Sequence, residues 1–456
     1  MRELDQLLRE FSGLAWGLPL LIILIGGGLY LIIKSRFLPF RYLGHAVQVL
    51  RGKYDDPDDP GQITHFQALT TALSATVGMG NISGVAVAIA VGGPGAVFWM
   101  WVSAVIGMST KYFTSTLAIL YRGKDSDGHI QGGPMYFITV GLGKRWKPLA
   151  VFFSICGLIG ALPVFNVNQL TQAVNDILLK PNGVEVGLLS NLMIGSVLVV
   201  LTAIVILGGI KRIGTVASRL VPSMVVLYFV LVAVILISHV DVLGYYFKLI
   251  ITDAFTAGYF PEDQPFLGGV LGALILHGIK RGAFSNEAGI GTAPMAHGAA
   301  KTDEPVREGL VAMLGPAIDT LVVCTLTALA ILVTGVWQTS EANGVSLTAT
   351  AFEDAMPLFG KYGLLLCISV FSISSLFSYS YYGTKCMSYL FGAHNKKIYH
   401  YFYIVSILIG ATTTLDMMIN LIDGVFALMA IPTMTATVIL APKVIAASKN
   451  YFARLK

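Results

Sequence analysis

Apolar stretches long enough to cross a lipid bilayer recur along this 456-residue chain, and they limit its possible folds more than any other feature. A membrane-spanning helix needs about 20 mostly apolar residues. Eleven stretches meet that requirement, with boundaries good to a few residues: 14–34, 66–90, 94–120, 148–175, 186–207, 213–238, 268–296, 306–335, 361–390, 398–417 and 419–446. Charged residues make up only 12% of the chain, against about 25% in soluble domains. The sequence therefore predicts an all-α, multi-pass integral membrane protein.

Lysine and arginine are spread unevenly over the loops between these spans. Of the 30 in the chain, 21 fall in the loops after the first, third, fifth, seventh and ninth spans or in the C-terminal tail, and five fall on the opposite side. Loops rich in basic residues stay in the cytoplasm. We therefore expect the N-terminus outside and the C-terminus in the cytoplasm, with the protein in the plasma (inner) membrane. The net charge of +5 is small for this length and does not indicate a nucleic-acid partner.

The residue types that enzymes use are not arranged for catalysis in this sequence. All four cysteines lie inside apolar segments, where we expect small core residues and not disulfides or metal ligands. His65, His277 and His297 have no evident partners at ligand spacing, and no catalytic triad, zinc motif or phosphate-binding loop stands out. We therefore expect a protein that is not an enzyme and carries no organic cofactor.

The second apolar stretch contains the sequence VGMGN, which is poor helix material. Gly78 and Gly80 flank Met79, beside Thr76 and Asn81, and glycine inside a helix costs about 1 kcal/mol relative to alanine. An opened helix is tolerated in a membrane only where protein or a cavity surrounds it, and such breaks hold substrates in many secondary transporters. Exposed amides here could receive a carboxylate, as helix N-termini do. The alternative is that the glycines only allow close helix packing.

A second interrupted helix is predicted at 277–291, where the chain reads HGIKRGAFSNEAGIG. Phe284, Ser285, Asn286 and Ile290 lie at or beside this opening and could face the same cavity as the first break. A polar step in the span 148–175 could also face it: Asn166, Asn168 and Gln169.

Charges inside membrane spans are candidates for function. Lys280, Arg281 and Glu287 belong to the second interrupted helix, and Asp319 lies in the middle of the next span. We expect these charges to pair with one another and hold the break in shape. A proton relay is the alternative.

The arrangement of the spans suggests an inverted repeat. One span precedes the rest in residues 1–65, and the other ten divide into five at 66–238 and five at 268–446, followed by a tail at 447–456. Each half begins with a glycine-interrupted helix, and these two helices enter the membrane from opposite faces. Corresponding broken helices in inverted halves indicate a binding site near the middle of the bilayer.

A group of oxygen donors suits a hard cation. The sequence FSISS places the Ser374 and Ser375 hydroxyls one turn after the Phe371 carbonyl, and the Ser74 and Val77 carbonyls precede the first break. Neutral oxygen ligands suit Na⁺ and are poor ligands for soft metals. The alternative is that the serines bond back to the preceding helical turn.

The stretch GGPGAVFWMWVSAVIG at 92–107 closely resembles the signature of the alanine/glycine:cation symporter family. The resemblance covers essentially the whole chain and continues through GNISGVA, QGGPMYF, KRGAFSNEAGIGTAPMA, DTLVVCT and SYYGTKC. It implies a LeuT-type fold, a 5+5 inverted repeat with one extra N-terminal helix, and uptake of small amino acids driven by Na⁺ or H⁺. VGMGN is also similar to the VGLGN of neurotransmitter:sodium symporters.

The resemblance also implies roles for individual residues. Gly80 and its neighbours would bind the carboxylate of the amino acid, and Phe284, Asn286 and Gln169 would line the pocket. The residues implied to hold Na⁺ are Ser74, Val77, Phe371, Ser374 and Ser375.

Two residues depart from the usual family pattern. Met79 stands where threonine is frequent, and Tyr379 stands where tryptophan often precedes SYYG. Both should border the part of the pocket that receives the substrate side chain. We therefore expect an importer of small neutral amino acids, alanine or glycine or both, with Na⁺ as the coupling ion. H⁺ coupling is one alternative, and a channel or sensor on the same scaffold is a more remote one.

Overall fold

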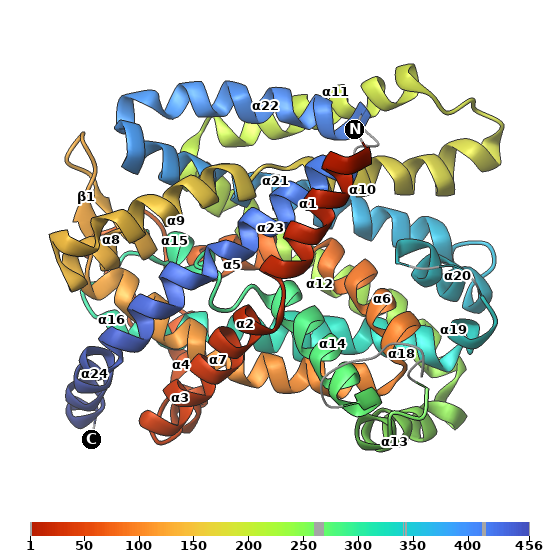
Figure 1. The fold of residues 1–456 in the computed structure, drawn as a ribbon, viewed down its shortest axis with the longest axis horizontal. Coiled ribbons are helices and arrows are strands. Elements are labelled where there is room, and N and C mark those ends of the chain that lie inside the picture. Colours follow the sequence, from red (N-terminus) through yellow and green to blue (C-terminus); the bar gives the residue numbers. More distant parts are fainter. Residues whose placement is uncertain (1, 260–268, 341, 343, 413–415, 456) are drawn as a thin grey trace.

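The computed structural model describes residues 2–259, 269–340, 342, 344–412 and 416–455 (Figure 1). Most of them are helical, and the described part contains one two-stranded antiparallel sheet, β1 (Gly123–Lys124) with β2 (Ile130–Gln131). The prediction of an α-helical protein is therefore confirmed.

Helical structure is present in each of the eleven predicted spans. The helices over these spans are α1 (Arg2–Ala15), α2 (Leu18–Leu21), α3 (Gly27–Lys34), α5 (His65–Thr76), α6 (Val85–Gly92), α7 (Gly95–Leu120), α9 (Lys147–Gly160), α10 (Val164–Val174), α11 (Leu188–Ile206), α12 (Gly209–Ser238), α14 (Gly269–Asn286), α15 (Ala293–His297), α16 (Pro305–Ala312), α17 (Leu314–Pro316), α18 (Thr325–Val333), α21 (Gly360–Phe391), α22 (Lys396–Thr412), α23 (Asp416–Leu428) and α24 (Ala430–Arg454). The helices between the spans are α4 (Leu43–Leu50), α8 (Pro134–Tyr136), α13 (Val240–Thr256), α19 (Val336–Thr339) and α20 (Val345–Ala355).

Fewer helices of the structure meet the length and composition of a membrane span than the sequence pattern predicts. Within the described residues, seven helices are long and apolar enough to cross a membrane, or eight if the bent pair α5 and α6 forms one span. Some of the other helices are short or carry charge: α22 has 17 residues, and α14 carries Lys280 and Arg281. A helix enclosed by other helices can carry such groups because lipid does not face them. The count of eleven spans stays a prediction, as does the 5+5 repeat.

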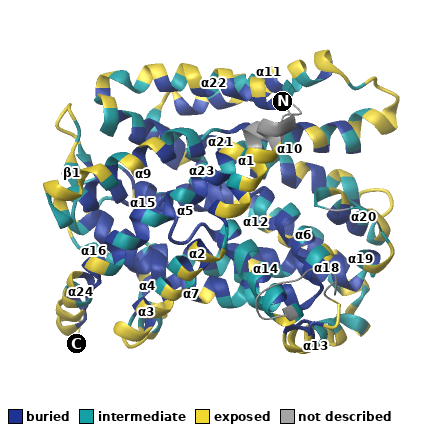
Figure 2. Cartoon of the chain, in the orientation of Figure 1, coloured by how far each residue is buried: buried dark blue, intermediate teal, exposed yellow. Residues whose placement is uncertain are grey.

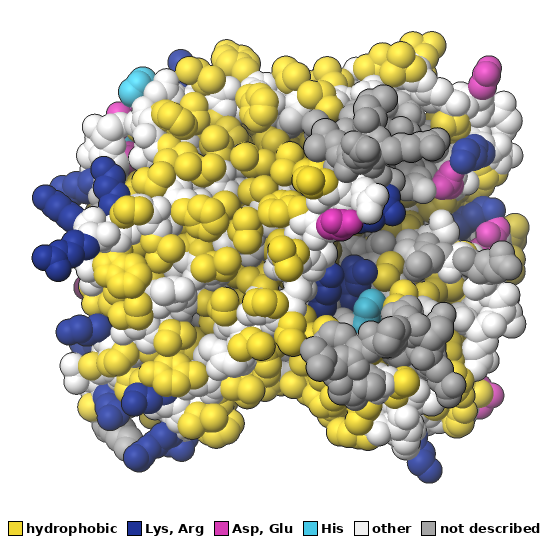
Figure 3. All heavy atoms as spheres, viewed as in Figure 1, with side chains coloured by type: hydrophobic (Ala, Val, Ile, Leu, Met, Phe, Trp, Pro, Cys, Tyr) yellow, Lys and Arg dark blue, Asp and Glu magenta, His cyan; other side chains and the backbone are white. Residues whose placement is uncertain are grey.

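The helices pack around a buried centre. α7 contacts α14 and α16, α12 contacts α5 and α21, and α11 contacts α22. Buried residues concentrate in the middle of the molecule, while α11, α22 and α13 carry many exposed residues (Figure 2). Hydrophobic side chains cover much of the visible face, and Lys and Arg gather at the left end, near β1 and the C-terminus (Figure 3). This distribution fits a protein whose sides face lipid.

The N-terminal helices lie against the end of the chain. α1 packs along α23. The Ser12 hydroxyl donates to the Asp423 carboxylate (2.9 Å), and the Trp16 indole N–H donates to the Asp423 carbonyl (3.3 Å). These bonds place Trp16, which is 2% exposed, beside the centre of the molecule.

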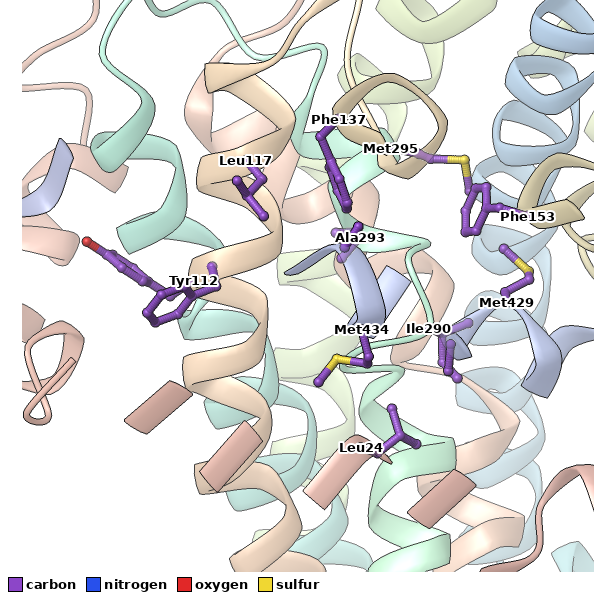
Figure 4. Close-up of a cluster of buried hydrophobic side chains, with 14 of the residues drawn as sticks. Leu24, Tyr112, Leu117, Phe137, Phe153, Ile290, Ala293, Met295, Met429 and Met434 are labelled. Atoms are coloured by element: carbon purple, nitrogen blue, oxygen red, sulfur yellow. The ribbon is translucent and has the colours of Figure 1, made fainter. Parts of the chain in front are cut away.

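A buried hydrophobic cluster holds the chain that follows the second interrupted helix. Ile290, Ala293 and Met295 of this segment lie within it (Figure 4). The side chains around them come from distant parts of the chain and include Leu24, Phe153, Met429 and Met434. The packing fixes the position of α15 relative to α9 and α24.

Candidate functional site

The first break lies between α5 and α6. α5 starts with a capping box formed by Thr64 and Gln67 and ends at Thr76. Val77 then takes an extended conformation (φ −74°, ψ 93°), and the helix resumes with a π-helical turn from Gly80. The two helical pieces meet at 56°. The chain therefore opens at VGMGN, where the glycines predicted a break.

Asn81 braces this break from the inside. Its Oδ1 accepts a hydrogen bond from the Gly78 amide (2.8 Å), and its Nδ2 donates to Asp319 Oδ1 (2.7 Å). Asp319 Oδ2 accepts bonds from the Ser285 and Thr320 hydroxyls (2.9 and 2.7 Å). A buried carboxylate is costly unless donors surround it. The network supplies them and joins the first break to α14.

The second break begins after Asn286, the last residue of α14. Glu287 follows with φ +54°, and Gly289 and Gly291 also have positive φ. A left-handed conformation at a residue other than glycine costs about 1–3 kcal/mol. The Glu287 carboxylate accepts hydrogen bonds from the Thr292 hydroxyl (2.6 Å) and the Tyr379 hydroxyl. These bonds offset the strain and turn the carboxylate toward α21.

A cavity of about 230 Å³ lies between the two breaks. Six of the ten predicted substrate-binding residues line it: Thr76, Gly78, Met79, Gly80, Phe284 and Tyr379. The rest of the lining includes residues from the N-terminal helices, α10, α14 and α23: Trp16, Phe165, Asn166, Lys280, Arg281, Ser285, Glu287, Asp423 and Phe426. The Phe284 ring meets Trp16 edge-on at 5.7 Å and Phe165 at 6.3 Å. The cavity therefore has an aromatic wall beside opened backbone.

The other four predicted substrate-binding residues lie elsewhere. The Asn81 side chain is bonded to the Gly78 amide and to Asp319. The Asn286 Oδ1 accepts a hydrogen bond from the Ala288 amide (3.0 Å) inside the second break. Ile290 is buried in the hydrophobic cluster of Figure 4. Gln169 lines a separate cavity of about 360 Å³. In this structure these four residues support or neighbour the central cavity and do not line it.

Sequence reasoning missed several lining residues, above all Trp16 and Asp423. Trp16 belongs to the extra N-terminal region, which no pattern connected to a site. Asp423 could have been predicted as a site residue, because a carboxylate within the apolar stretch 419–446 is a candidate for function. Its partners could not be read from the sequence, since Ser12 is 411 residues away.

The expected pairing among the buried charges is not the one observed. In the described part of the chain, no ion pair joins Glu287 or Asp319 to Lys280 or Arg281. The two carboxylates accept bonds from hydroxyl and amide groups instead. Lys280 and Arg281 line the cavity together with Asp423. Figure 3 shows Lys or Arg and a His side chain inside a recess on this face. The charges do not pair as expected because the left-handed turn at Glu287 directs its side chain toward Thr292 and Tyr379.

Comparison with known proteins identifies the family. Residues 1–456 match the family described as the sodium:alanine symporter family. The chain belongs to the sodium:alanine symporter family. It is a transporter and not an enzyme.

Relatives of this sodium:alanine symporter family member extend over nearly its whole length. The chain is 39% identical to the sodium/alanine symporter AgcS of Methanococcus maripaludis, covering 98% of this chain and 97% of that one. It is 34% identical to the probable sodium/glutamine symporter GlnT of Bacillus subtilis (98% and 91% covered). It is also 36% identical to the putative sodium/proton-dependent alanine carrier protein YrbD of the same organism (85% and 79% covered).

A solved structure supports the fold. The crystal structure of MhsT in complex with L-phenylalanine matches with a TM-score of 0.57 over 85% of this chain and 98% of that chain, at 12% sequence identity. At this identity the likeness concerns the fold alone, and it agrees with the LeuT-type fold that the sequence resemblance implies.

Four of the five predicted Na⁺ donors of this symporter, Ser74, Phe371, Ser374 and Ser375, meet beside the first break. The Ser374 hydroxyl donates to the Phe371 carbonyl (2.8 Å) and approaches the Ser74 carbonyl (3.4 Å). The Ser375 hydroxyl also donates to the Phe371 carbonyl (3.1 Å), as the alternative interpretation predicted. Val77 follows α5 at the same break. All five residues are buried, and each serine oxygen keeps lone pairs to offer, so this neutral oxygen set fits a hard cation.

Proposed function

We propose that this protein is a Na⁺-coupled symporter that imports small neutral amino acids, alanine or glycine or both, by alternating access. The observation that carries the proposal is the 230 Å³ cavity between two opened helices, with the buried oxygen donors directly beside it. The relatives AgcS, a sodium/alanine symporter, and YrbD, a putative sodium/proton-dependent alanine carrier protein, support this substrate class.

The carboxylate of the substrate is expected at the start of the resumed helix. The Gly78 amide is already bonded to Asn81, so the amides of Met79 and Gly80 are the donors left for it. The first amides of a helix lack partners within the helix and attract anions. The substrate side chain would then point to the wall formed by Phe284 and Tyr379, with Met79 limiting its size.

The ion would be held by oxygens of Ser74, Val77, Phe371, Ser374 and Ser375, where it supplies a positive charge beside the first break. At a membrane potential of about 100 mV, one Na⁺ contributes roughly 2.3 kcal/mol, and a tenfold gradient adds about 1.4 kcal/mol. Together these permit roughly 500-fold accumulation of a neutral substrate at one-to-one coupling.

Proton coupling is the second candidate, and one observation favours it. The Glu287 carboxylate is 4% exposed, lines the cavity and is bonded by two hydroxyls. Such a group could bind and release a proton with the substrate. The relative YrbD is described as a putative sodium/proton-dependent carrier.

The proposed orientation places the N-terminus outside and the C-terminus in the cytoplasm of the plasma membrane. It rests on the 21-to-5 distribution of basic residues and on the positive-inside rule. The proposed repeat halves are 66–238 and 268–446. A reporter fused after Lys456 should be cytoplasmic and a tag before Arg2 accessible from outside, and both termini on one side would contradict this arrangement.

Uptake of labelled amino acids into proteoliposomes tests the function. Alanine and glycine should accumulate with a Na⁺ gradient, and replacement of Na⁺ by K⁺ should abolish the accumulation. Accumulation driven equally by a pH gradient without Na⁺ would establish the proton alternative. Unlabelled substrate inside the vesicles should accelerate entry of labelled substrate by counterflow, which a channel cannot do.

A further inference from the structure

A second large cavity lies along the same helix that lines the central one. α21 contributes Tyr379 to the central cavity and Tyr381, Lys385 and Ser388 to another cavity of about 540 Å³. The other walls include the segment before α5, β2, the start of α12 and the start of α22. With a rise of 1.5 Å per residue, Lys385 lies about 9 Å farther along α21 than Tyr379.

A small apolar cluster lies between α5, α12 and the end of α15 at this level. It consists of buried Ile63, Ala68, Ile210, Ala299 and Ala300, and the side of Tyr381 packs on it. Ile63 and Ile210 belong to segments that also line or adjoin the second cavity. The cluster packs the N-terminal end of α5 against α12 and the residues that follow α15.

The second cavity is lined by Lys385, a buried amine with no bonded acid in the part of the chain that the structure describes. Lys385 is 4% exposed, and its Nζ donates to the Gly132 and Met295 carbonyls (2.7 and 2.8 Å). Among the described residues, no carboxylate forms an ion pair with it. An ammonium group has three donors, so one remains. A buried charge is costly unless an opposite charge accompanies it, which makes this wall favourable for an anion.

The remaining charges around this cavity increase that preference. Lys211 and Lys396 also line it. Lys396 bonds to Asp125 (3.0 Å). Burial raises the pKa of Asp125, but the bond and charge of Lys396, together with the backbone N–H groups of His129 and Asp127, lower it on balance, so the charges of Lys396 and Asp125 offset each other. Lys211 and Lys385 also line the cavity, and no carboxylate among the described residues forms an ion pair with either of them.

Two buried hydroxyls complete the set of donors. Tyr381 and Ser388 both line the cavity, and their buried hydroxyl oxygens have no hydrogen-bond partner among the residues that the structure describes. Buried polar groups are normally bonded, so each exception asks for an explanation. The Lys385 Nζ lies 5.2 Å from the centre of the Tyr381 ring. The charge and one unpartnered hydroxyl therefore belong to neighbouring side chains one helical turn apart.

We propose that this second cavity is a release site, in which Lys385 and Tyr381 bind the α-carboxylate of the amino acid after it leaves the central cavity toward the cytoplasm. The inference rests on the proposed function and orientation. Opening of the apolar cluster would join the two cavities, and α21 would carry the carboxylate from the amides at the first break to the ammonium of Lys385.

Transport from each face of the membrane tests the release site. In everted vesicles the cytoplasmic face is outside, and Tyr381→Phe should raise the alanine concentration for half-maximal transport about tenfold, because a hydrogen bond to a charged group is lost. In right-side-out vesicles the half-saturating concentration should stay within about twofold of the wild type. Lys385→Gln should act in the same direction more strongly, and Lys385→Arg should restore most of the affinity.

Tyr382→Phe is the matched control. Its buried hydroxyl also has no hydrogen-bond partner within the described ranges, but Tyr382 does not line the cavity. It should leave both half-saturating concentrations unchanged. An unchanged value for Tyr381→Phe in everted vesicles, or an equal change for Tyr382→Phe, would overturn the release site. If Lys385→Gln fails to insert into the membrane, the comparison of Tyr381→Phe with Tyr382→Phe still tests the release site.

Inorganic phosphate distinguishes the substrate from another anion. Phosphate at the cytoplasmic face should compete with alanine in the wild type and compete less in Tyr381→Phe. Phosphate binding that is lost in Tyr381→Phe while alanine transport is unaffected would assign the cavity to an inorganic anion and overturn the proposal. Absence of Na⁺-dependent alanine transport in the wild type would instead refute the proposed function, so the two failures are distinct.

Discussion

Alanine substitutions at the two glycines of the first break should have different consequences. A Cβ added at Gly78 would lie 3.0 Å from the Ser375 Oγ, whereas a Cβ at Gly80 would lie 3.5 Å from Ser285 Cα and 3.7 Å from the Phe284 ring. Neither glycine has a positive φ, so alanine fits both backbones. The difference is therefore one of contact: Gly80→Ala is accommodated, and Gly78→Ala forces the Ser375 hydroxyl to move.

The size of the effect follows from the role proposed for that hydroxyl. Ser375 donates to the Phe371 carbonyl at 3.1 Å, and both oxygens belong to the proposed Na⁺ set. Displacing one polar ligand should cost about 1–3 kcal/mol, which is roughly a 5- to 150-fold increase in the Na⁺ concentration for half-maximal uptake. Gly80→Ala should change this concentration less than about threefold and should leave uptake measurable.

Na⁺ titration of alanine uptake in proteoliposomes measures the difference, with surface expression as the control. The double variant Gly78→Ala with Ser375→Ala removes both the clash and the hydroxyl. It should be no worse than Ser375→Ala alone, because residues in contact are not additive. A Gly78→Ala variant with the Na⁺ dependence of the wild type would refute the reasoning, as would additive effects in the double variant.

Three further predictions concern the same break. Gly80→Leu places a long side chain toward the pocket wall and should abolish substrate binding while the protein still inserts; near-normal affinity in a binding assay would argue against a site here. Met79→Ala should improve larger neutral amino acids relative to glycine by about tenfold, since steric discrimination is worth about 1–3 kcal/mol; an unchanged order in competition assays would make Met79 a packing residue. Asn81→Ala removes the hydrogen bonds to the Gly78 amide and to Asp319 Oδ1 and should lower the melting temperature of the purified protein by several degrees; an unchanged melting temperature would show that these Asn81 bonds contribute little to stability.

The positions of both breaks could be predicted because they depend on local backbone preference. VGMGN opens between Thr76 and Gly80, and the second break falls at Glu287, Gly289 and Gly291, all with positive φ. Glycine chemistry acts within a few residues, so the sequence itself carries the signal. The five Na⁺ candidates were also placed by local position, since each lies at the end of α5 or within one turn of α21.

The cavity or core region that each side chain faces could not be predicted in the same way. Ile290 lies beside the second break, but residues from distant segments surround it, and it joins the core (Figure 4). Asn166 and Gln169 are one turn apart on α10, yet they line different cavities. A step of three residues moves about 4.5 Å along a helix, which is enough to pass from one cavity to the next. Such outcomes depend on how elements far apart in sequence meet.

The arrangement around the first break gives a physical route for coupling ion and substrate. Of the proposed Na⁺ donors, Ser74 lies in the last turn of α5 and Val77 is the first residue after this helix. Met79 and Gly80 supply the amides proposed for the carboxylate. Gly78 lies between these two sets, close to Ser375. An ion that orders the end of α5 therefore also fixes the Met79 and Gly80 amides. Substrate binding then loses less conformational entropy. Coupling is reciprocal, so alanine should lower the Na⁺ concentration needed for binding by the same factor by which Na⁺ lowers that of alanine. This equality is measurable on the purified protein by titrating each ligand at several fixed concentrations of the other.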